Sequence, residues 1–98
     1  MTAYVIYLGE VTDPEAYEAY KVRAAASIAA AGGRYVVRGG EPLVLEGEPP
    51  AGRTVVLAFP DRASAVAWYE GEQYRGAREL RQAAAVARMY VVDGYEPD

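Results

Sequence analysis

The stretch that decides the fold is residues 34–59, RYVVRGGEPLVLEGEPPAGRTVVLAF, which holds two runs typical of strands and no helical pattern between them. The runs 34–38 and 53–59 are rich in Val, Tyr, Leu and Phe, which strands favour. Residues 39–52 contain four Gly and three Pro, so they predict a long connection, with a short extended piece at 43–45. Two strands joined without a helix pair most simply as an antiparallel hairpin.

A strand and a helix precede this hairpin. Residues 3–10 form a contiguous β-favouring run. A helix then begins near residues 12–15, where two start signals overlap: Thr12 with Glu15 fits a capping box, and Asp13 before Pro14 fits an N-cap followed by proline in the first turn. Glycines 32 and 33 end the helix. Its apolar stripe recurs at three- and four-residue spacing: Tyr17, Tyr20, Ala24, Ile28 and Ala31.

A second helical region and a last strand follow the hairpin. Asp61 is placed to cap a helix that breaks near Gly71, a further helix runs from about 72 to 85, and residues 86–93 form a strand. The order is therefore β-α-β-β-α-β. With right-handed crossovers it predicts a single α+β domain over residues 1–98, a ferredoxin-like sandwich whose four-stranded antiparallel sheet has its helices on one face.

Composition excludes several classes of function. The chain of 98 residues has a net charge of −4, no Cys and no His. An acidic chain is poorly suited to nucleic acid or an anionic membrane surface. Without thiol or imidazole groups, and with carboxylates spread out, we expect no disulfide, metal site or cofactor. The first ten residues lack the basic region of a signal peptide, so we expect a cytoplasmic protein.

The strands indicate that the domain has a partner. Residues 3–10, 53–59 and 86–93 are apolar on both faces of the expected sheet, yet the helices can cover only one face. A second copy packed sheet to sheet is the simplest cover. The alternative is a monomer whose second sheet face is only mildly apolar and stays exposed to solvent. If Val55 or Val91 lies on the partner side, a Glu there should weaken the dimer.

A set of short segments along the chain occurs in a recognisable order: residues 13–17, 32–35, 38–40, 46–47, 53, 59–60, 67–69, 74 and 81. Together they resemble a known family, DUF1330, whose members belong to the dimeric α+β barrel superfamily. The resemblance covers nearly the whole chain and implies the ferredoxin-like protomer and the sheet-to-sheet homodimer, but no activity, since the family is of unknown function. One departure is Gly71, where the family pattern has Ser.

Two basic residues and one acidic residue form the first candidate ligand site. Pairing of the strands 34–38 and 53–59 brings Arg38 and Arg53 to the same end of the sheet, and Glu46 lies in the connection between them. Two guanidinium groups can hold a small anion by bidentate hydrogen bonds. The alternative is an Arg–Glu network that fixes the connection to the sheet.

Aromatic residues at the helix break form the second candidate. Trp68, Tyr69 and Tyr74 could orient a substrate or donate protons, or could simply pack between helix and sheet. Trp68 and Tyr69 are adjacent, so they point about 100° apart on a helix. Arg81 either reaches over the cleft between helices and sheet or pairs at the surface with Glu72 or Glu79.

The sequence leaves three functions open. The first is a homodimer that binds a small, possibly anionic molecule. The second is a cofactor-free isomerase or oxygenase that uses Tyr, Glu or Arg as its proton-handling groups, with Glu46 or a tyrosine as the base because arginine stays protonated. The third is a purely structural dimer. No catalytic residue can be assigned from these patterns.

Overall fold

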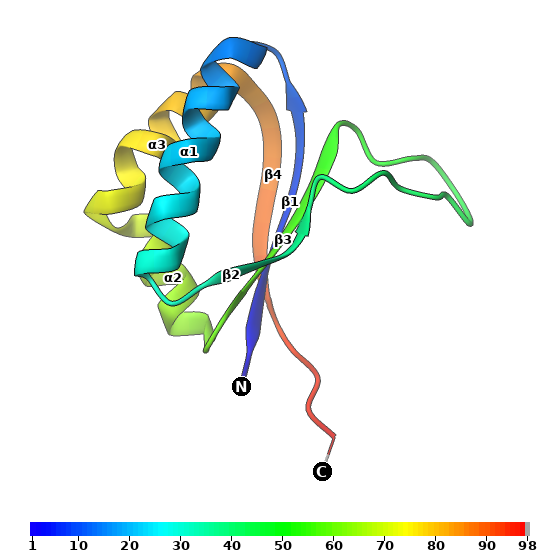
Figure 1. Ribbon diagram of the computed structural model, residues 1–98. Helices are drawn as coiled ribbons and strands as arrows, with labels where there is room; N and C mark the ends of the chain where they lie inside the picture. Colours follow the sequence, from blue (N-terminus) through cyan, green and yellow to red (C-terminus); the bar gives the residue numbers. More distant parts are fainter. Residues whose placement is uncertain (98) are drawn as a thin grey trace.

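Seven elements follow one another in the computed structural model, which describes residues 1–97. Strands β1 and β4 run side by side at one edge of a four-stranded antiparallel sheet of order β2-β3-β1-β4, and the helices lie together on one side of it (Figure 1). The predicted ferredoxin-like α+β fold is confirmed. The elements are β1 (Ala3–Val11), α1 (Pro14–Ala30), β2 (Arg34–Arg38), β3 (Arg53–Phe59), α2 (Arg62–Glu70), α3 (Glu72–Ala84) and β4 (Ala85–Asp93).

Side-chain caps set the helix starts. Asp13 is the N-cap of α1, because its carboxylate accepts a hydrogen bond from the backbone N–H of Ala16 at 3.2 Å, and Pro14 opens the helix. Asp61 caps α2 in the same way through the N–H of Ser64. The break at Gly71 separates α2 from α3, and Gly71 provides no side-chain hydrogen bond there.

The alternation of the strands gives the sheet two different faces. On β1, Ala3, Val5 and Tyr7 are buried under the helices, while the side chains between them stay partly exposed. The uncovered face is nevertheless apolar, and Val86 and Tyr90 are 73% and 50% exposed there. Its apolar side chains come from all four strands: Tyr4, Ile6, Leu8, Val37, Val56, Val86, Tyr90 and Val92. Three polar or charged residues share this face: Arg34, Thr54 and Arg88.

Two residues named as interface positions lie on the other face. Val55 pairs with Tyr7, and Val91 pairs with Val5, so both point toward the helices. The expectation that they could face a partner is wrong. A one-residue shift in strand register exchanges the two faces, and the pattern of these doubly apolar strands does not set that register.

The connection 39–52 projects away from the helices (Figure 1). It contains no strand, and the extended piece expected at 43–45 leaves Leu43 and Leu45 almost fully exposed. At its end, Gly52 has φ +76° and lies against the backbone carbonyl of Gly9, where a side chain would not fit. Over residues 1–97, no helix is long and apolar enough to cross a membrane.

Candidate functional site

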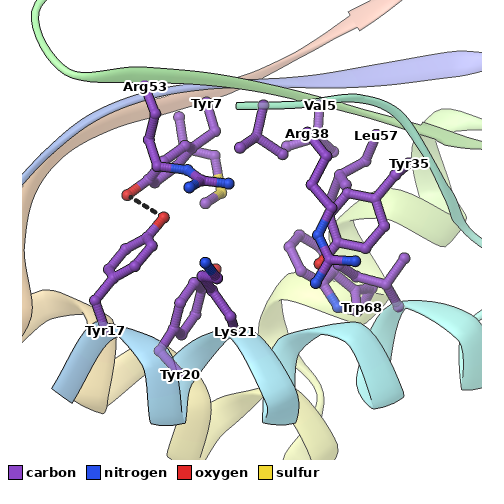
Figure 2. Close-up of a pocket in the computed structure, with 13 residues that line it drawn as sticks. Val5, Tyr7, Tyr17, Tyr20, Lys21, Tyr35, Arg38, Arg53, Leu57 and Trp68 are labelled. Carbon is purple, nitrogen blue, oxygen red and sulfur yellow. Dashed lines mark hydrogen bonds between the residues drawn. The ribbon is translucent and has the colours of Figure 1, made fainter. Parts of the chain in front are cut away.

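A narrow cavity lies between α1 and the helix-covered face of the sheet (Figure 2). Its volume is about 30 Å³, room for one or two water molecules. Figure 2 shows Arg53, Tyr7 and Tyr17 at one end, with Arg38, Tyr35 and Trp68 at the other. The remaining walls come from Val5, Tyr20, Lys21, Ile28, Val55, Leu57 and Met89.

The charge lining this cavity is all of one sign. Lys21, Arg38 and Arg53 line it, and no Asp or Glu of residues 1–97 does. Lys21 pairs with Glu18 on the outer side of α1, whereas neither arginine takes part in an ion pair among residues 1–97. Three cations beside an apolar, aromatic wall favour an anionic ligand.

A β-bulge aims Arg38 at the cavity. Tyr35 pairs with Leu57 and Arg38 pairs with Val55, so both point to the helix-covered face. In a regular strand, residues three apart point to opposite faces, but the register shift between Tyr35 and Val37 adds one residue and restores the direction. The guanidinium of Arg38 stacks on the Tyr35 ring at 4.4 Å.

Arg53 enters the cavity from the sheet. Its Nε atom is buried and has no hydrogen-bond partner, the only side-chain nitrogen or oxygen among residues 1–97 in that state. Its guanidinium carbon lies 5.7 Å from the centre of the Tyr17 ring and also touches the position of Gly39, which has φ +72° and leaves room for it. A buried donor without an acceptor costs free energy, so this atom marks a place where a ligand oxygen fits.

Tyrosine hydroxyls at the cavity form two hydrogen-bonded pairs, each with one member on α1. Tyr17 donates a hydrogen bond to the Tyr7 hydroxyl at 3.2 Å, shown dashed in Figure 2. The hydroxyls of Tyr20 and Tyr74 lie 2.9 Å apart, and the Nε of Arg81 donates to Tyr74 at 3.3 Å. The Arg81 charge therefore sits behind Tyr74, which sits behind the cavity wall at Tyr20.

Burial sets the protonation of these groups. Desolvation raises the pKa of Tyr17, Tyr20 and Tyr35 above the ordinary tyrosine value, against the opposing effect of the nearby arginines. Desolvation alone would lower the pKa of Arg81, but Tyr74 and the other tyrosines outweigh it and the pKa is raised. At neutral pH the tyrosines are hydrogen-bond donors and the arginines are charged.

The predicted site residues fall into two groups. Arg38, Arg53 and Trp68 line the cavity, and Tyr74 and Arg81 lie directly behind it. Glu46 stays in the exposed connection and makes no hydrogen bond or ion pair among residues 1–97. The Arg–Glu network considered from the sequence is therefore absent from that part of the chain.

Arg81 lies in the core instead of at the surface. It is only 6% exposed and pairs with neither Glu72 nor Glu79; Glu72 instead binds Arg75 at 2.9 Å. The expectation of a surface ion pair is wrong. Arg81 belongs to the apolar side of α3, together with Tyr74, Ala77 and Ala84 at three- and four-residue spacing, and that spacing was the signal for its burial.

Five polar cavity residues were not singled out from the sequence: Tyr7, Tyr17, Tyr20, Lys21 and Tyr35. Tyr17 and Tyr20 were assigned to the apolar stripe of the first helix, which is where they lie. Two phenols on the buried face of one helix need partners for their hydroxyls. In the sequence, two buried tyrosines whose hydroxyls require hydrogen-bond partners were the signal that predicts a polar cluster beneath α1.

A second, wider groove of about 270 Å³ adjoins the cavity between α2 and β4. Val5, Trp68 and Met89 line both spaces and form the partition between them. Tyr69 lines only this groove, where Arg78 lies over its ring. The groove is mostly apolar, so it is suited to the uncharged part of a ligand.

Residues 2–95 match the family model described as a domain of unknown function, DUF1330. The chain belongs to the DUF1330 family. The family assignment inferred from residues such as 13–17 and 67–69 is confirmed, but DUF1330 carries no established activity. No curated protein matches the chain.

Solved structures resemble this DUF1330 protein in fold. The RPA0582 protein of unknown function from Rhodopseudomonas palustris superposes with a TM-score of 0.80 at 23% identity, covering 98% of this chain and 84% of that one. SnoaB, a cofactor-independent oxygenase from Streptomyces nogalater, gives 0.65 at 13% identity and coverage of 98% and 95%. Rv0793 from Mycobacterium tuberculosis gives 0.62 at 16%, covering 99% and 98%. At these identities the likeness extends to the fold alone.

Proposed function

We propose that this DUF1330 protein is a homodimer that binds a small organic anion in the cavity between α1 and the sheet. The buried, unpartnered Nε of Arg53 carries the proposal. Arg38 adds a second guanidinium that is in no ion pair among residues 1–97, whereas the charge of Lys21 is paired with Glu18. The apolar wall and the adjoining groove favour a carboxylate with a flat, apolar body, such as a benzoate.

Entry of such a ligand requires the cavity to widen. Arg38 is exposed and stacked on Tyr35, and the Lys21 side chain is 29% exposed. Long charged side chains at a mouth change rotamer at little cost. Met89, in the partition, has the flexible side chain that fits irregular gaps. Binding therefore proceeds by movement of these three side chains, with the carboxylate against Arg53.

The uncovered sheet face supports the dimer. Side chains such as Ile6, Val56 and Tyr90 neighbour one another across three strands and meet no covering element. Burying apolar surface gains about 25 cal/mol per Å². A second copy places the same patch against itself about a two-fold axis, the usual arrangement of homodimers.

Titration with benzoate tests the anion site. Wild-type protein should bind benzoate and show a raised melting temperature, and Arg53→Gln should weaken binding at least about 10-fold by loss of a charge-assisted hydrogen bond. Arg23→Gln is the matched control, since Arg23 is an exposed arginine on α1 that does not line the cavity. The proposal is wrong if wild-type protein does not bind benzoate at millimolar concentration, or if both variants lose the same amount of benzoate affinity. The purely structural dimer would then remain.

A cofactor-free enzyme is the second candidate, favoured by the tyrosine hydroxyls at the cavity. SnoaB, which shares the fold, is named a cofactor-independent oxygenase. Glu46 lies away from the cavity, so tyrosines would handle protons here, as donors because of their raised pKa. Mass spectrometry of phenolic carboxylates incubated with the protein in air distinguishes the two candidates: a binder returns them unchanged.

A further inference from the structure

The hydrogen bonds around Tyr74 have a direction. Arginine Nε can only donate, so Arg81 occupies a lone pair of the Tyr74 hydroxyl oxygen at 3.3 Å. That arrangement favours Tyr74 donating its own proton to the Tyr20 oxygen, 2.9 Å away. In this direction, Tyr20 accepts from Tyr74 and keeps its own proton for another acceptor. Because Tyr20 lines the cavity, this proton is available to whatever occupies it.

The Arg81 charge is uncompensated in the core. The residue is 6% exposed, and no Asp or Glu of residues 1–97 pairs with it. The ring of Tyr7 also lies near it, with its centre 5.8 Å from the guanidinium carbon. Burial of a cation without a counter-ion is costly. A negative charge on a bound ligand would offset this free-energy cost, because the hydrogen-bonded hydroxyls of Tyr74 and Tyr20 connect the ligand to Arg81.

We propose that Tyr20 donates a hydrogen bond to a second oxygen of the ligand, and that Tyr74 and Arg81 are positioning residues that polarise this donor. The inference rests on the proposed function, in which Arg53 holds the carboxylate. It narrows the ligand to a hydroxy acid of phenolic or enolic type, whose second oxygen carries negative charge when bound. The two oxygens lie toward different elements: Arg53 reaches in from β3 and Tyr20 from α1.

The matched probes are 3-fluoro-4-hydroxybenzoate and 3-fluorobenzoate, which differ by the phenol alone. The hydroxylated probe should bind wild-type protein at least 10-fold more tightly. Its ¹⁹F resonance, followed against pH, should show that the bound phenol ionises at least one pH unit lower than the free phenol. Stabilisation of the phenolate by Tyr20 and the Arg81 charge produces both effects.

Tyr20→Phe should abolish the preference for the hydroxylated probe and the shift in ionisation, while 3-fluorobenzoate binds within twofold of wild type. Arg81→Met should reduce the ionisation shift with Tyr20 intact, a readout that a merely structural role would not move. Tyr95→Phe, an exposed tyrosine that lines neither the cavity nor the groove, is the control and should change neither.

Three outcomes overturn the inference. If both probes bind wild-type protein with equal affinity and the phenol ionises as it does in water, the Tyr20 donor is wrong while the anion site stands. If neither probe binds, the anion site fails and the inference fails with it. A shift that survives in Tyr20→Phe would also overturn it, since another group would then contact the phenol.

Discussion

The two faces of the sheet are both apolar in sequence, yet they differ in where their polar groups lie. The helix-covered face holds Arg53 and Tyr7, and Arg81 approaches it from α3. The uncovered face presents mainly aliphatic and aromatic side chains such as Ile6 and Tyr90. Arg34 and Arg88 also lie on the uncovered face, where they are exposed to solvent. The covered face differs because its charged groups lie within the apolar core.

In the proposed function, the two faces meet different partners. A small ligand with a negative charge suits the covered face, because an anion offsets the charge of Arg53 and Arg81 in the core. An extended apolar surface suits the open face, because a second protein surface removes it from water. The comparison is sharpest at neighbouring residues of β1, where Val5 faces the helices and Ile6 lies on the uncovered face.

The largest expected effect is that of Val5→Glu. Val5 is 1% exposed and packs between Leu57 and Val91 on the covered face, so a carboxylate there is buried without a partner. We expect a loss of more than about 4 kcal/mol of stability, enough to unfold the domain. Circular dichroism during urea titration measures it. Wild-type-like unfolding would mean that this face is not the core.

Ile6→Glu should leave the protomer folded and separate the copies. Ile6 pairs with Val56 and Tyr90 on the open face, and the two-fold axis brings two new carboxylates into one interface. We expect dimerisation to weaken on the order of 100-fold or more. Sedimentation at low micromolar concentration measures it, with Val22→Glu on the exposed side of α1 as the control. A variant that stays fully dimeric would refute the sheet-to-sheet arrangement.

Alkaline pH should destabilise the covered face. The pKa of Tyr20 is raised in the folded protein, mainly by burial, above the ordinary value near 10. The unfolded state therefore loses this proton first, so stability is complete below about pH 10 and falls as pH rises, by about 1.4 kcal/mol per pH unit for one such tyrosine.

Urea unfolding between pH 8 and pH 11 checks this dependence. Tyr20→Phe should make the slope shallower by the contribution of one proton, while Tyr17 and Tyr35 keep theirs. Tyr95→Phe, at an exposed position, should leave the slope unchanged. A slope that is the same in Tyr20→Phe and wild type would show that the buried hydroxyl is not its source.

The smallest expected effect is that of Arg81→Met on stability. Methionine fills a similar volume and removes a buried charge that has no counter-ion, so we expect a change below about 1 kcal/mol, or a gain. Tyr74 keeps its hydrogen bond with Tyr20. Thermal unfolding without ligand measures the difference. A loss of several kcal/mol would make Arg81 a structural residue and weaken the case for a ligand.

Features that depend on neighbouring residues in the sequence were easier to predict than contacts between residues far apart in the chain. The order of elements and the caps at Asp13 and Asp61 followed from local signals. The bulge at Val36, which turns Arg38 toward Tyr35, has no such signal, because it depends on how β2 registers against β3. Glu46 was grouped with the arginines by its place in the chain, and the outward path of the connection separates them.

By itself, the sequence determined the β-α-β-β-α-β order, the ferredoxin-like sheet and the surplus of apolar strand surface, because helix caps, glycine breaks and strand propensities act over a few residues. Only the tertiary structure decided which strand residues share a face, that Arg81 is buried, and that the hydroxyls of Tyr20 and Tyr74 meet. Those contacts join residues up to 54 positions apart, and they form only when the helices settle on the sheet in a particular register.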